Sequence, residues 1–194
     1  LKMIEENFSY ETVFRYLRSG FSGISTEEAD ILENYCLALG IRGFKKYSEK
    51  WIRFSKNMTD AELQIVNEIR VKFYDSVKDA ALILKDKNES ITRKCTVIYE
   101  FLEKLEVEKQ LSIKEEEFLD AGDAVMAKEY HQIFRVSMDL LEKYVELLGE
   151  EMISLEEFSE LLDAGFVEVK VGVIPPGSDR DVVGDMERTR LKDV

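Results

Sequence analysis

Residues 59–84 read TDAELQIVNEIRVKFYDSVKDAALIL and predict a long, one-sided helix at the centre of the fold. Apolar residues recur at steps of three and four, which places them together on one helical face. Thr59 and Glu62 have the spacing of a capping box, in which two side chains satisfy free backbone N–H groups. We therefore predict a helix from Asp60 to about Leu84. Its inward face should consist of Val66, Ile69, Phe73, Val77, Ala80 and Leu84.

The neighbouring sequence carries the same local signals. Glycine and proline, the strongest breakers of regular structure, are both absent between Phe44 and Ala121, so we expect helix after helix there. Side-chain oxygens that cap a free helix start predict three further helices. They are 10–18 behind Ser9, 26–39 behind Ser25 with Glu28 and ending at Gly40, and 91–105 behind Ser90. The inward face of the second should be Ala29, Leu32, Tyr35, Cys36 and Leu39.

A longer helix is predicted over 114–148, with Gly122 as a possible break. Apolar residues seven apart form its stripe, and Tyr130 and Tyr144 widen it. A coiled coil would show the same spacing, but the flanking charges are patchy, which favours packing within one bundle. The stripe consists of Leu119, Met126, Ile133, Leu140 and Leu147.

The last forty residues change character. Ser154 should open a short helix that ends at Ala164. FVEVKVGVIPPG (166–177) and DVVGDMERTR (181–190) then alternate β-branched and polar residues around a Pro-Pro-Gly turn, which predicts two strands. The predicted fold is therefore mainly α, a multi-helix bundle over 1–165 followed by a short β-strand pair over 166–194. Two strands make a marginal sheet, so their partners should lie in further sequence.

Composition limits the class of protein. The 194 residues suffice for a hydrophobic core, and the net charge of −13 makes the whole surface a poor nonspecific binder of nucleic acid. No apolar run approaches the roughly 20 residues that cross a bilayer, and the N-terminus lacks the features of a signal peptide. We expect no membrane contact and a cytoplasmic location. The start at Leu1 rather than Met, and an end without a helix cap, suggest a piece of a longer polypeptide.

The search for catalytic and metal-binding residues finds none. Cys36 and Cys95 lie far apart in apolar patterns, and His131 is the one histidine, so we expect buried thiols and a helix-surface or packed histidine that binds no metal. The phosphate-binding pattern GxxxxGK[ST] is absent. A calcium loop beginning at Asp179 fails because Arg190 stands where the closing glutamate belongs. We predict no cofactor and no metal in this chain.

One local stretch suggests binding instead. RGFKKYSEKWIRFSK (42–56) carries six cations and one acid, a net +5 in a chain whose remainder is −18. Its aromatic residues are interleaved with the cations. This arrangement is typical of nucleic-acid-binding surfaces, in which cations contact the phosphates and aromatic rings stack on the bases. Equally, the rings could be core anchors and the cations their solvated flank. The candidate nucleic-acid-binding residues are Arg42, Lys45, Lys46, Lys50, Trp51 and Arg53.

Three phrases resemble a known family. NFSYETVFRYLRSGFSGISTEEADILENYCLALGIRG (7–43), followed by Trp51, is similar to a segment of the AddB (RexB) subunits of bacterial helicase-nucleases. The resemblance resumes in EYHQIFRVSMDLLEKYVELLGEEMISLEEF (129–158) and in VGVIPPGSDRDVVGDMERTR (171–190). The phrases occur in the family's order and leave about 45–115 as unmatched helix.

The resemblance implies a non-catalytic helical accessory domain of a superfamily 1 helicase-like subunit, with the strand pair returning to a motor domain. It implies double-strand-break repair and DNA end processing together with an AddA (RexA) helicase-nuclease partner. ATP, magnesium and an iron–sulfur cluster would be bound outside this chain. Arg188 and Arg190 align with the family's terminal RxR and would contact DNA phosphate, contact the motor core, or form a salt-bridge cluster.

Two other functions remain open from the residues alone. The acidic composition and the long helix also suit a helical protein-interaction module unrelated to DNA. A small metal-dependent enzyme is the third possibility, although its ligands are missing from the sequence. Salt-dependent affinity for DNA would favour the helicase-nuclease domain over the interaction module. Tight, stoichiometric metal in the purified protein would favour the enzyme.

Overall fold

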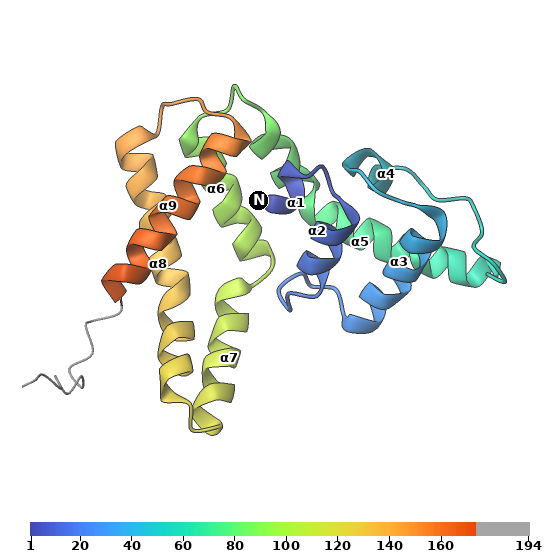
Figure 1. Cartoon of the computed structure of the whole chain (residues 1–194), viewed down its shortest axis with the longest axis horizontal. Coiled ribbons are helices and arrows are strands. Elements are labelled where there is room, and N and C mark those ends of the chain that lie inside the picture. The colour runs from blue at the N-terminus through green and yellow to red at the C-terminus, as the bar shows by residue number, and fades with distance from the viewer. Residues whose placement is uncertain (174–194) are drawn as a thin grey trace, which may run out of the picture.

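The computed structural model describes residues 1–173, over which the chain is helical and has no strand. The helices α1–α5 lie together in one half of the molecule and α6–α9 in the other, with α7 and α8 projecting as a hairpin (Figure 1). The predicted mainly α fold is confirmed. The helices are α1 (Lys2–Glu5), α2 (Tyr10–Leu17), α3 (Thr26–Leu39), α4 (Phe44–Ser48), α5 (Asp60–Lys85), α6 (Ile91–Lys104), α7 (Val107–Asp120), α8 (Ala124–Leu148) and α9 (Leu155–Val173).

Helix α5 is the centre of the fold, because α1, α3, α4 and α6 all pack against it. All six residues of its predicted inward face are buried, and Phe73 is completely so. Phe73 meets the rings of Phe8 and Tyr47, which joins α5 to the turn before α2 and to α4. The predicted face of α3 is buried as well, except for the half-buried Leu39. These apolar faces form one core, as their helical spacing predicts.

The predicted helix starts are confirmed in position and in chemistry. The side chains of Ser25 and Thr59 each accept from a backbone N–H three residues on, and Glu28 and Glu62 complete both capping boxes. The hydroxyls of Ser9 and Ser90 cap α2 and α6. Gly40 ends α3 with a φ of 67°, a left-handed conformation that costs little only for glycine.

The expectation of helix after helix from Phe44 is wrong over residues 49–59. This segment is extended and turned, although it contains neither glycine nor proline. Trp51 explains the break, because its backbone N–H donates to the Asn67 side chain instead of a helical carbonyl. Tertiary burial of one large ring thus overrides local helix preference.

The expected long helix over 114–148 is two helices. Gly122, with a φ of 78°, turns the chain so that α7 and α8 pack side by side. The predicted seven-residue stripe is mostly not the buried face, because Leu119, Ile133 and Leu147 are half or more exposed. Leu140 is buried where α9 covers α8.

The short helix expected to end at Ala164 instead continues to Val173. The strand predicted from residue 166 is therefore wrong as far as 173, and the rest of the strand pair lies outside the described residues. Packing explains the difference, since Gly165 lies directly against α8, where an added Cβ would meet Tyr144 at 2.2 Å. The Tyr144 hydroxyl also donates to the Leu161 carbonyl at 2.6 Å. No helix within residues 1–173 is both long and apolar enough to cross a membrane.

Lys94 joins the two halves of the molecule. Its side chain is fully buried, and its ammonium group donates to the carbonyl oxygens of Leu84 at 3.0 Å and Asp86 at 2.6 Å. The last carbonyl groups of a helix lack hydrogen-bond donors and carry a partial negative charge. A buried ammonium group supplies the donor and also balances the charge. Burial lowers the pKa of Lys94, and the charges of Asp86 and Glu89 oppose this shift without cancelling it.

Replacing Lys94 with methionine should lower the free energy of unfolding by about 1–3 kcal/mol, because buried carbonyls at the end of α5 lose their donor. Urea denaturation followed by circular dichroism measures the change. The control is Lys128→Met, at an exposed position on α8, which should change stability by less than about 0.5 kcal/mol. Equal stability of the Lys94 variant and the parent chain would contradict this role.

Candidate nucleic-acid interface

The basic stretch 42–56 spans α4 and the loop that leads to α5. In Figure 1 this loop forms the end of the molecule farthest from α8 and α9. All six of its cations are exposed, and five of them are predicted site residues. The structure therefore brings Arg42, Lys45, Lys46, Lys50 and Arg53, together with Lys56, to one segment of the surface. The predicted site residues Arg188 and Arg190 lie outside the described residues.

The aromatic residues of the stretch divide into two kinds. Tyr47 and Trp51 are buried, with 0% and 5% of their surface exposed. Trp51 stacks on Tyr35 of α3, with ring centroids 5.0 Å apart and planes 10° from parallel. A stacking ring must offer an open face to a base, so Trp51 acts as a core anchor and not as the predicted base platform. Phe54, by contrast, is 50% exposed.

Polar groups hold the backbone at Trp51. Its N–H donates to Asn67 Oδ1 at 2.9 Å, and Asn67 Nδ2 donates back to the Trp51 carbonyl at 2.9 Å. The indole N–H donates to the Lys46 carbonyl at 2.8 Å. Buried polar groups that are all paired fix one geometry, so α4, the loop and α5 are tied together at this point.

Arg70 completes this arrangement from α5. Its side chain is buried, lies 5.9 Å from the Trp51 ring centroid, and donates to the Tyr47 carbonyl at 2.5 Å. Burial lowers the pKa of Arg70, yet a guanidinium stays protonated at any physiological pH. Sequence reasoning missed Arg70 and Asn67. The available signal was two polar residues beside the apolar face of the 60–84 helix.

The charges on this surface are largely uncompensated. Within residues 1–173, Lys46 is the one cation of the stretch that forms an ion pair, with Glu49 at 3.0 Å. The other five have no carboxylate within 4 Å among the described residues. Exposed cations without partners are free to neutralise phosphate, which favours an anionic ligand.

Neither cysteine is poised to act as a nucleophile or a metal ligand. Burial raises the pKa of Cys36 to about 12 and that of Cys95 to about 11, so neither thiol ionises near neutral pH. The two thiols are buried on different helices and do not fit an iron–sulfur cluster, which needs four cysteines. His131 is exposed and lies 3.1 Å from Glu115. No group of three or more metal-ligating side chains occurs within residues 1–173.

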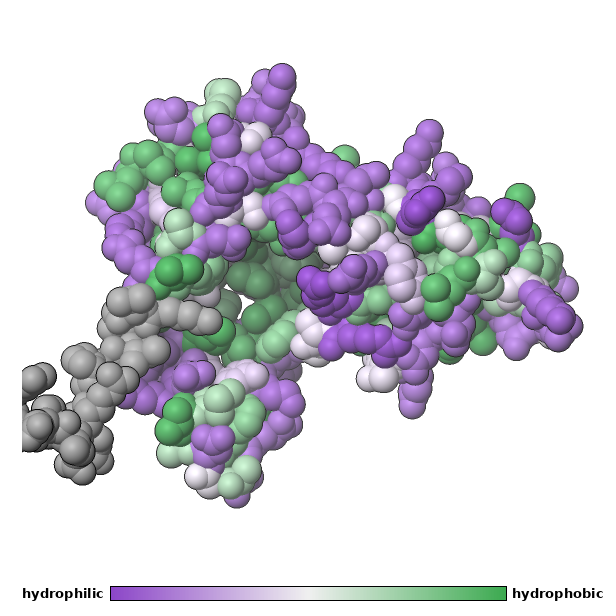
Figure 2. All heavy atoms as spheres, in the orientation of Figure 1, coloured by the Kyte–Doolittle hydropathy of each residue, from purple (hydrophilic) through white to green (hydrophobic). Residues whose placement is uncertain are grey.

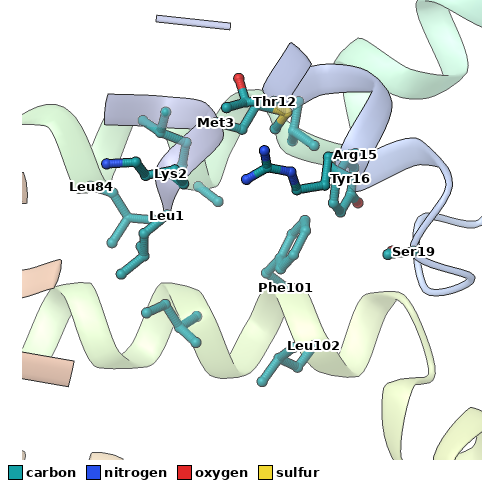
Figure 3. A pocket seen from close by; sticks show the side chains of 14 residues that line it. Leu1, Lys2, Met3, Thr12, Arg15, Tyr16, Ser19, Leu84, Phe101 and Leu102 are labelled. Atoms are coloured by element: carbon teal, nitrogen blue, oxygen red, sulfur yellow. The ribbon is translucent and has the colours of Figure 1, made fainter. Parts of the chain in front are cut away.

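A separate apolar cavity of about 420 Å³ lies between α1, α2, α5 and α6. Figure 3 shows Tyr16 and Phe101 facing each other across it, and Figure 2 shows an apolar hollow near the middle of the molecule. Tyr16 has a hydroxyl without a partner among the described groups, and burial raises its pKa to about 12. The walls are mostly aliphatic, and the two cations that line them, Lys2 and Arg15, are paired with Glu5 and Glu11.

The buried position of Trp51 predicts a large loss of stability when the ring is removed. Trp51→Ala should lower the free energy of unfolding by about 3–5 kcal/mol, whereas Ile52→Ala, 74% exposed, should change it by less than about 0.5 kcal/mol. Denaturant unfolding of both variants measures the difference. As the only tryptophan, Trp51 should also be shielded from acrylamide quenching. Equal stability of the two variants, or free quenching, would show that the ring is not an anchor.

Known proteins resemble the chain along its full length. It is 38% identical to the AddB subunit of the ATP-dependent helicase/deoxyribonuclease of Lachnoclostridium phytofermentans. It is 37% and 34% identical to the proteins of the same name from Clostridium novyi and Clostridioides difficile. Each alignment covers 100% of this chain and 17% of the relative. No protein-family model matches the chain.

The three relatives agree with one another in name, and each is aligned with the whole of this chain. The chain spans about a sixth of their length, 17% in each case. The alignments include the segment of about 45–115, to which the resemblance does not extend. The chain therefore belongs to the AddB family of ATP-dependent helicase/deoxyribonuclease subunits, and it corresponds to one segment of these proteins.

Proposed function

We propose that this chain is a non-catalytic helical domain of a bacterial helicase-nuclease subunit, and that its basic stretch contacts DNA. The observation that carries the proposal is the set of exposed cations on a loop that Trp51 and Asn67 hold in place. Each contact to a phosphate releases a counterion, so such a loop binds the DNA backbone without reading its sequence. The rest of the chain, at −18, repels DNA and confines the contact to this end.

The whole protein would act in double-strand-break repair and DNA end processing. The name of the relatives, an ATP-dependent helicase/deoxyribonuclease subunit, supports this role. In the proposal an AddA (RexA) subunit is the partner, and ATP, magnesium and an iron–sulfur cluster are bound outside this chain. The absence of a phosphate-binding GxxxxGK[ST] pattern from the sequence supports that division of labour. A cytoplasmic location in bacteria follows from the same role.

The division of the chain is also a proposal. We place the accessory domain over the helical region and assign the final residues, including Arg188 and Arg190, to the return toward a motor domain. Helix α9 would belong to the accessory domain, because its first half packs on α8 through Tyr144 and Leu140. The boundary would then lie after Val173 rather than at 165.

A second candidate function is a protein-interaction module, and the α7–α8 hairpin favours it. Ile113, Leu119, Val125 and Ile133 are each about half or more exposed on this hairpin. Exposed apolar side chains on a projecting element are typical of protein interfaces. The two functions involve different surfaces, so variants at each surface distinguish them.

Reversing the charges of Lys45, Lys46 and Lys50 to glutamate should weaken DNA binding strongly. The slope of log K against log salt should become shallower by about 2–3, because three phosphate contacts are lost. Fluorescence anisotropy with a labelled oligonucleotide over a salt series measures both quantities. A matched control reverses Lys87, Lys128 and Lys143, which are exposed elsewhere and change the net charge equally. Equal weakening by both triple variants would assign the effect to net charge and contradict a local site.

The purified chain should neither hydrolyse ATP nor cut DNA in magnesium buffer. The described residues supply no metal-ligand group, and burial keeps both thiols protonated. A malachite-green phosphate assay and a gel assay of labelled duplex measure the two activities. Turnover that co-purifies with the chain through successive columns would refute a non-catalytic domain.

A further inference from the structure

Phe54 is the one large aromatic side chain of the basic stretch that the core leaves open. Half of its surface is exposed, whereas Tyr47 and Trp51 are buried and Phe44 packs against Phe8 and Tyr74. Covering an exposed phenyl ring with a partner would remove a large apolar surface from water. Its neighbours Arg53 and Lys56 are both exposed cations.

The backbone on either side of Phe54 is fixed. The Tyr35 hydroxyl donates to the Arg53 carbonyl at 2.6 Å, and the Met58 N–H donates to the Ser55 carbonyl at 3.2 Å. The ring is therefore presented from a loop anchored before and after it. A preorganised contact loses less conformational freedom on binding, which favours affinity.

The surroundings of Phe54 and of Ile52 differ. Ile52 lines a groove along α5 whose walls carry both signs of charge, with two carboxylates and the cations Lys50, Arg70 and Lys72. Phe54 does not line that groove. A series of contacts joins the loop at Phe54 to α4. Tyr35, which holds the carbonyl of the preceding Arg53, stacks on Trp51. The Trp51 indole N–H in turn donates to the Lys46 carbonyl of α4.

We propose that Phe54 is a stacking platform for an unpaired base, and that the basic surface prefers single-stranded over duplex DNA. The proposal rests on the DNA contact proposed above and deepens it. Cations that follow a phosphate backbone, with an exposed ring between them, are how proteins hold single strands without sequence preference. In a duplex the base faces are stacked on one another, so the Phe54 ring would find no partner there.

The test measures binding of the full 194-residue chain to a labelled thymidine oligonucleotide of about 16 nucleotides, at low salt. Phe54→Ala should weaken binding roughly five- to a hundredfold, since one stacked base is lost. Phe54→Tyr keeps a ring and should bind as the parent does. Phe54→Leu keeps apolar bulk without a ring and should bind as weakly as the alanine variant. Leu82→Ala, another exposed apolar position, is the control and should have no effect.

An abasic oligonucleotide of equal length separates rings from phosphates. The parent chain should bind it more weakly than the thymidine oligonucleotide, and Phe54→Ala should cause no further loss. For duplex DNA, Phe54→Ala should likewise cause little change. Binding of the alanine variant that equals the parent's on the thymidine oligonucleotide would overturn the stacking role.

The charge-reversed variant distinguishes the two proposals. Loss of binding on reversing Lys45, Lys46 and Lys50, together with no effect of Phe54→Ala, would overturn the stacking role and leave the phosphate contact standing. Failure of the parent chain to bind any oligonucleotide at low salt would overturn both. Circular dichroism of the Phe54 variants should match the parent, because a half-exposed side chain contributes little to the core.

Discussion

The burial of Trp51 is the interaction on which the arrangement of the basic surface depends. Its ring lies against Tyr35 and close to Arg70, and its backbone groups pair with Asn67. These contacts connect the loop at Trp51 to α3 and α5. The indole N–H connects it to α4 as well, because it donates to the Lys46 carbonyl. A loop without glycine or proline would otherwise be free to extend α4. Because the anchor is buried and its polar groups are paired, the cations project from a fixed frame.

Charge and packing act together in this molecule. A chain of net charge −13 repels polyanions at long range, so the proposed DNA contact would be limited to the local stretch of +5. The opposite half differs in chemistry, since the α7–α8 hairpin exposes aliphatic side chains among acidic ones. Lys94 connects the halves by satisfying the carbonyls that end α5. The packing of α5 on α6 therefore connects the half that carries the basic stretch to the half that carries the α7–α8 hairpin.

Much of the fold was predictable because its signals are local. Capping residues such as Ser25 and Thr59, and the apolar period of α5, act within a few residues, and the structure confirms them. Long-range packing decided the rest. The extension of α9 depends on Gly165 lying against α8, and the extended loop depends on Asn67, sixteen residues beyond Trp51. Sequence alone left the role of Trp51 undecided, because core anchors and stacking rings alternate with cations in the same pattern.

The most direct measurement of the central claim is a map of backbone amide shifts, by nuclear magnetic resonance, as a single-stranded oligonucleotide is added to the labelled chain. If the basic stretch contacts DNA, the largest shifts should fall within residues 42–56 and fade as salt is raised. Amides of the α7–α8 hairpin should not move. Shifts centred on that hairpin, or no shifts at low salt, would contradict the proposal that this chain contacts DNA through its basic loop.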